Sequence, residues 1–172
     1  MTIQIEAPPP ARLREPAVIG SPDDPGLHPK LRDLWRFWNM LRGERTTPRC
    51  DEVHAAILKP WLGNVLLLDV VDGGRDFRYR VYGTVVAAHF GFDLTGRLVS
   101  QCVDLIGPKP LQEYRRVTEA RSPEAVARIS PAARDHLQMD KLALPLAAID
   151  GGPVTRILAG LYASEAEETR AS

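Results

Sequence analysis

Length, composition and charge narrow the classes of protein to which this chain can belong. Its 172 residues can bury one hydrophobic core without disulfides or metals, so we expect one domain. Apolar residues make up 44% and charged residues 26%, as in soluble globular proteins. Lysine plus arginine equals aspartate plus glutamate at 22 each, which excludes the positive field of a non-specific nucleic-acid binder. The apolar stretches are far shorter than the ~20 residues that cross a bilayer, so no membrane partner is expected.

Both ends of the chain differ from its middle. Six prolines lie between residues 8 and 25, and they favour extended backbone over helix or sheet. We therefore expect a mobile arm over residues 1–26, a folded domain over residues 27–164 and a disordered tail over residues 165–172. The first residues lack the apolar run of a secretory signal, and Cys50 and Cys102 match no metal or disulfide spacing. These features predict a cytoplasmic protein with reduced thiols.

The first predicted helix covers residues 27–42 and has an unusually large apolar face. Its apolar residues at helical spacing include Leu31, Leu34, Trp35 and Trp38. Two arrangements use this face: a homodimer formed through it, which we prefer, or packing of both tryptophans on the chain's own sheet. A second, short helix is predicted from Asp51 until Pro60 interrupts the pattern.

The middle of the chain predicts a β-hairpin followed by helices. Residues 64–71 and 75–83 form the two strands around the turn sequence DGGR. Alternation in the second strand sets Phe77, Tyr79 and Val81 against Arg78, Arg80 and Tyr82. A short helix ended by Gly91, several short helical turns and a longer helix over residues 108–121 follow.

The last part of the domain returns to strands. Residues 124–130, 136–150 and 152–164 have strand patterns, with a turn at Asp150 to Gly152. Pro145 cannot donate to a strand ladder, so we expect it at a bulge or on a free edge. The whole order predicts an α+β fold: a five-stranded antiparallel sheet with helices on one face and an added N-terminal helix.

This order of elements resembles the PAS fold, and several stretches sharpen the likeness. LRDLWRFWNMLRG, FRYRVYGT, GFDLTG and LALPLAAIDGGPVTRILAGL are similar to a small PAS-like family of alphaproteobacterial proteins. The resemblance covers residues 27–161. It implies a stand-alone sensory or regulatory domain that binds a small ligand, a protein partner or both in signalling, and it implies no reaction.

A sensory ligand of such a domain sits between the sheet and the helices. The residues expected to line this pocket are Arg80, Tyr82, His89, Phe90, Arg156 and Tyr162. Arg80 could hold an anionic ligand, or it could pair with Asp93 or Asp69 instead. The ligand itself is not identified by the sequence.

Cofactors and metals are not expected. His89 could face haem iron, but no second haem signal accompanies it, and Cys102 lacks the Asn-Cys-Arg pattern of flavin-binding relatives. The four histidines have no metal-ligand spacing. Haem, flavin and metal sites are therefore not predicted.

Two other classes of function stay open beside the sensor. No catalytic motif is present, so we expect no enzyme, but Asp69 amid leucines could be the base of a small α+β isomerase. That hypothesis requires an open polar pocket around Asp69, whereas pairing of Asp69 with Arg80 is the interpretation we favour. A structural adaptor without ligand would instead have a filled core.

Overall fold

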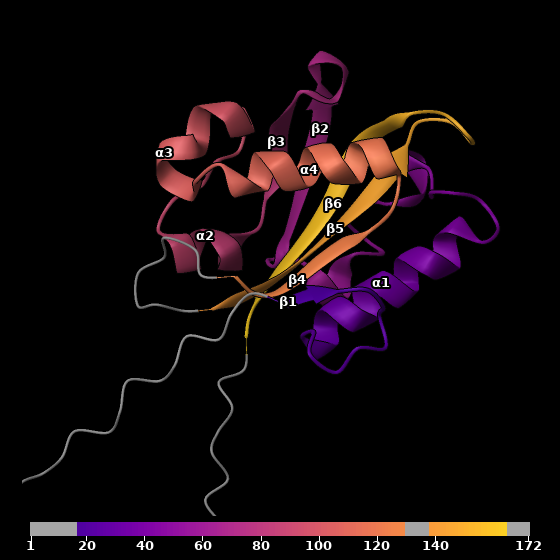
Figure 1. Cartoon of the computed structure of the whole chain (residues 1–172), viewed down its shortest axis with the longest axis horizontal. Coiled ribbons are helices and arrows are strands. Elements are labelled where there is room, and N and C mark those ends of the chain that lie inside the picture. Colours follow the sequence, from indigo (N-terminus) through magenta and orange to yellow (C-terminus); the bar gives the residue numbers. More distant parts are fainter. Residues whose placement is uncertain (1–16, 130–137, 165–172) are drawn as a thin grey trace, which may run out of the picture.

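The fold is built on one antiparallel sheet of six strands (Figure 1). The computed structural model describes residues 17–129 and 138–164. In spatial order the strands are β1 (Ala17–Ile19), β4 (Glu124–Ile129), β5 (Met139–Ala147), β6 (Val154–Ala163), β2 (Val65–Val71) and β3 (Asp76–Tyr82). The α+β class is confirmed, with six strands where the sequence predicted five.

The additional strand, β1, lies in the segment expected to be a mobile arm. It pairs with β4 through Val18 and Val126, and Ile19 and Leu27 are buried in the core. Residues 17–26 therefore belong to the domain. Three residues are too few for an alternating pattern, which is why the sequence did not reveal this strand. Residues 1–16 of the predicted arm and the predicted tail lie outside the described residues.

Helices cover both faces of the sheet, which makes three layers (Figure 1). One face carries α2 (Thr84–Phe90), α3 (Val103–Ile106) and α4 (Lys109–Ala120), as the sequence predicted. The opposite face carries α1 (Pro29–Arg42). Strand β5 is buried along its whole length because both of its faces are covered. In the described part of the chain no helix is long and apolar enough to cross a bilayer.

The apolar face of α1 packs on the chain's own sheet. Its four central side chains are only 0–6% exposed: Leu31, Leu34, Trp35 and Trp38. The approach is close, because a Cβ added at Gly160 of β6 would lie 2.6 Å from the Leu31 Cδ2 atom. The second of the two arrangements considered from the sequence is therefore the one observed. These four residues are buried within one copy of the chain, so they do not form the exposed surface that the expected dimer requires.

Pro145 lies on a locally free edge, as predicted. Pairing of β5 with β4 reaches only as far as Ala143 and Glu124, whereas Pro145 pairs with Ile157 of β6 on its other side. The indole of Trp38 donates a hydrogen bond of 2.9 Å to the Pro145 carbonyl oxygen. This bond satisfies a backbone acceptor that no strand reaches.

A β-bulge changes the predicted alternation in β3. Leu67 pairs with Val81 and Leu68 pairs with Tyr79, so Arg80 is left without a partner in the ladder. The extra residue turns Tyr82 to the same face as Tyr79, and Val81 is 43% exposed. The strict alternation inferred from the sequence is wrong after Tyr79.

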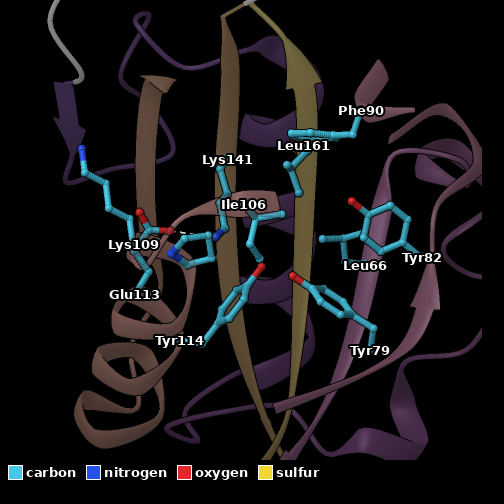
Figure 2. A pocket seen from close by; sticks show the side chains of 11 residues that line it. Leu66, Tyr79, Tyr82, Phe90, Ile106, Lys109, Glu113, Tyr114, Lys141 and Leu161 are labelled. Carbon is cyan, nitrogen blue, oxygen red and sulfur yellow. Dashed lines mark hydrogen bonds and ion pairs between the residues drawn. The ribbon is translucent and has the colours of Figure 1, made fainter. Parts of the chain in front are cut away.

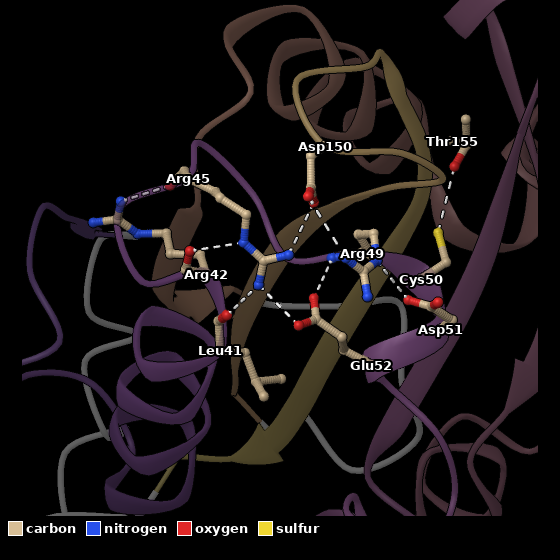
Figure 3. A network of polar contacts seen from close by, with 9 residues as sticks. All are labelled: Leu41, Arg42, Arg45, Arg49, Cys50, Asp51, Glu52, Asp150 and Thr155. Atoms are coloured by element: carbon tan, nitrogen blue, oxygen red, sulfur yellow. Dashed lines mark hydrogen bonds and ion pairs between the residues drawn. The ribbon is translucent and has the colours of Figure 1, made fainter.

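The helix predicted from Asp51 to Pro60 is replaced by two 3-10 turns, Cys50–Glu52 and Lys59–Trp61. A polar network holds this region in place (Figure 3). Arg45 donates to Glu52 at 2.8 Å and to Asp150 at 3.0 Å, which joins the end of α1 to the turn between β5 and β6. The Glu52 carboxylate also accepts from the backbone N–H of Arg49 at 2.7 Å, so it closes the first turn locally.

Candidate ligand-binding site

A cavity of about 100 Å³ lies between the sheet and helices α2, α3 and α4 (Figure 2). We call it the tyrosine pocket. It is lined by Leu66, Tyr79, Tyr82, Phe90, Ile106, Lys109, Pro110, Glu113, Tyr114, Lys141 and Leu161. Three of the four tyrosines of the chain line the pocket, which adds hydroxyl groups to its mainly apolar wall.

The three tyrosines come from two elements. The β3 bulge brings Tyr79 and Tyr82 to the pocket face, where their rings meet edge to face at 5.3 Å. Tyr114 comes from α4, and its hydroxyl points toward that of Tyr79 (Figure 2). All three side chains are buried, and burial raises the pKa of each phenol above its ordinary value of 10. Their hydroxyl groups therefore stay neutral and can donate hydrogen bonds.

A buried ion pair forms the polar end of the pocket. The Nζ atom of Lys141, on the central strand β5, donates to Oε2 of Glu113, on α4, at 2.7 Å. The Lys141 side chain is 5% exposed and the Glu113 side chain 13% exposed. The same ammonium lies 4.1 Å from the centre of the Tyr114 ring. A buried charge needs a partner of opposite sign, and here the ammonium and the carboxylate are partners of one another.

Two of the six predicted pocket residues line the pocket, namely Tyr82 and Phe90. Arg156 and Tyr162 are next in sequence to Ile157 and Leu161, whose side chains lie on the pocket face of β6. Because side chains alternate along a strand, Arg156 and Tyr162 lie on the opposite face, which α1 covers. Arg80 is the bulge residue, which has no partner in the β2–β3 ladder, and it does not line the cavity. His89 is a partly exposed residue of α2 that does not line the cavity either.

Arg80 pairs with Asp69, one of the two acids considered from the sequence. Its Nε atom lies 3.0 Å from Oδ2 of Asp69, and Arg156 Nε lies 2.9 Å from Oδ1. Asp93 instead accepts from the hydroxyl of Thr95 at 2.6 Å. Both oxygens of Asp69 are thus held by arginines, and Asp69 does not line the tyrosine pocket. Within the described residues the Asp69 carboxylate is thus an ion-pair partner, which is the interpretation favoured from the sequence.

Three features of the pocket were not predicted from the sequence: the Lys141–Glu113 pair, Tyr79 and Tyr114. One usable signal was Lys141 itself. It stands in the segment MDKLALPL, residues 139–146, where its neighbours are almost all apolar. Another was Glu113, which lies beside the apolar stripe of α4 that includes Tyr114 and Val117. The pairing of these two positions, 28 residues apart, could not be read from either segment alone.

His89 and Cys102, the residues considered for a cofactor, do not line the pocket. The Cys102 thiol is buried and donates to the Leu98 carbonyl oxygen at 3.2 Å, and burial raises its pKa. Within residues 17–129 and 138–164, no group of three or more His, Cys, Asp or Glu side chains could hold a metal ion.

The fold and the pocket together define an α+β domain with a small cavity enclosed between an antiparallel sheet and its covering helices. A family model described as PAS domain matches residues 27–162. Because this match spans most of the chain, the protein belongs to the PAS domain family, as the resemblance implied. The searches of curated proteins and of solved structures found no match.

Proposed function

We propose that this chain is a sensory PAS domain that binds a small molecule in the tyrosine pocket and signals through a protein partner. The observation that carries the proposal is a cavity in the core whose mainly apolar wall carries polar groups: three tyrosines and a buried ion pair border a space of about 100 Å³. Burying such groups costs free energy, which a bound ligand can offset through hydrogen bonds. A purely structural adaptor would be expected to fill this space with apolar side chains.

The partner and the setting remain part of the same proposal. We expect the domain to act in the cytoplasm, where Cys50 and Cys102 would stay reduced as the free thiols of this structure. A homodimer remains our expectation, but it must use other residues than the buried face of α1. The outward face of that helix carries Lys30, Asp33 and Arg36, with Met40 as its exposed apolar residue.

Native mass spectrometry on protein purified from its own host tests the proposal. We expect the protein to carry a small non-covalent mass. Leu161→Phe, which adds volume at the pocket wall, should abolish that mass, because Leu161 lines the cavity and is 5% exposed.

Val81→Phe is the matched control. Val81 lies in β3 of the same sheet but faces solvent, so this variant should retain the bound molecule. Thermal melting should show that both variants fold. A wild-type protein without any bound molecule, or equal retention by the two variants, would overturn binding in the pocket.

A further inference from the structure

We propose that the tyrosine pocket selects a small uncharged molecule with an acceptor oxygen, of the carbonyl class, on a compact apolar body. This inference rests on the proposed function, and it names the ligand chemistry that the pocket recognises. Size, charge and hydrogen-bonding capacity each limit the ligand independently.

The volume of the cavity limits the ligand to a few non-hydrogen atoms. Drug-sized ligands occupy pockets of roughly 300–1,000 Å³, and a cavity of about 150 Å³ holds benzene. The tyrosine pocket measures about 100 Å³. The part of a ligand that lies within the cavity without rearrangement is therefore no larger than benzene.

Charge favours a neutral ligand. The Lys141 ammonium and the Glu113 carboxylate neutralise one another at 2.7 Å within the pocket wall. An added anion would lie against buried Glu113, and an added cation against buried Lys141, without a free counter-ion. Lys109 lines the mouth, but it is exposed and its ammonium points away from the three tyrosines (Figure 2). Desolvating either kind of ion here is thus uncompensated.

Hydrogen-bonding capacity favours an acceptor. An ammonium group has three N–H donors, and Lys141 directs one to Glu113 and lies against the face of Tyr114. One donor remains for the cavity, beside tyrosine hydroxyls that burial keeps protonated. A carbonyl oxygen accepts from such donors, while Leu66, Ile106 and Leu161 surround its apolar body.

A series of probes with the same number of non-hydrogen atoms tests this ligand class: acetone, acetate and trimethylammonium. Each is titrated into the ¹⁵N-labelled full chain at matched ionic strength, and amide chemical shifts around Tyr79, Tyr82 and Tyr114 are followed. We expect acetone to bind with a dissociation constant on the order of 1–10 mM. The two ions should bind at least about tenfold more weakly, because each must be desolvated without a partner.

A double variant tests the donor. Lys141→Met with Glu113→Leu removes the ion pair without leaving an unpaired charge, and it should weaken acetone binding about tenfold by removing a charged donor. The matched control, Arg116→Met with Glu124→Leu, removes a more exposed pair that joins the same helix, α4, to β4, and it should leave binding unchanged. Melting curves establish that both proteins are folded.

The outcomes separate the two proposals. Tighter binding of acetate or trimethylammonium would overturn the uncharged ligand class and leave ligand binding in the pocket intact. Equal acetone binding by the Lys141 double variant would overturn the donor role of this lysine. Absence of shifts in the pocket with all three probes would overturn this inference, whereas native mass spectrometry alone decides whether the pocket binds a molecule at all.

Discussion

Breaking the Lys141–Glu113 pair one side at a time should destabilise the protein far more than removing it whole. Lys141→Met leaves the Glu113 carboxylate, 13% exposed, without its cation, and Glu113→Leu leaves the ammonium, 5% exposed, without its anion. A buried charge that loses its partner costs about 3 kcal/mol or more of the free energy of unfolding. Replacing both ions by apolar side chains of similar size is often neutral, to within roughly 1 kcal/mol. We therefore expect a coupling energy of about 5 kcal/mol in the double-mutant cycle.

Urea unfolding followed by tryptophan fluorescence measures these energies. Trp35, Trp38 and Trp61 are all buried in the cluster on the α1 face, so they report global unfolding without touching the substituted pair. Each single variant should lower the melting temperature by roughly 10 °C. The double variant should melt within a few degrees of the wild type, about 3 °C.

The Arg116–Glu124 pair is the control that isolates burial. Its shortest N···O distance is 2.6 Å, similar to that of the buried pair, but the Arg116 side chain is 56% exposed. Water screens such a pair, and its coupling energy should not exceed about 1 kcal/mol. Equal, small coupling energies for both pairs would refute the reasoning, because they would mean that water reaches Lys141 as freely as it reaches Arg116.

Three further expectations concern other parts of the fold. Gly160→Ala should lower the free energy of unfolding by about 1–3 kcal/mol in urea, since the new Cβ would lie 2.6 Å from Leu31 Cδ2; unchanged stability would contradict the close packing of α1. Arg45 holds the pKa of Glu52 below its ordinary 4.5, so the stability that Glu52 adds over Glu52→Gln should be present above pH 4.5 and disappear as the pH falls further. Burial raises the pKa of all four tyrosines above 10, so the free energy of unfolding should fall as the pH rises past 10. Near-ultraviolet tyrosinate absorbance should appear only with unfolding; tyrosinate absorbance from the folded protein near pH 10 would contradict this.

Local pattern was sufficient for most of the fold. The stripe of Tyr114 and Val117 predicted α4, and the turn sequence DGGR with its two flanking strands predicted the β2–β3 hairpin. These elements are specified by residues close together in the sequence. The helix expected from Asp51 failed because the Glu52 carboxylate accepts from the Arg45 side chain and from the Arg49 backbone N–H, which stabilises a different local conformation there.

The pocket was harder to predict because it depends on pairing between distant segments. A one-residue bulge opposite Leu67 and Leu68 decides that Tyr82 joins Tyr79 on the inner face, and nothing in the strand sequence marks that bulge. Arg80 was placed in the pocket by the alternation that the bulge interrupts. Lys141 was overlooked because a lysine in a strand is usually solvated, and only the packing of α4 over β5 makes it buried.

Strand β5 connects the pocket to the opposite face of the sheet. Lys141 faces the pocket, whereas its neighbour Asp140 faces α1 and accepts a 2.7 Å hydrogen bond from the backbone N–H of His28, the residue that precedes this helix. A ligand that accepts the remaining N–H of Lys141 would therefore contact the strand in which the preceding residue, Asp140, is bonded to the start of α1. If the double-mutant cycle shows that an apolar pair is equally stable, stability does not account for this ion pair. What the pair binds, and the strand and helix that it joins, then become the reasons for its presence.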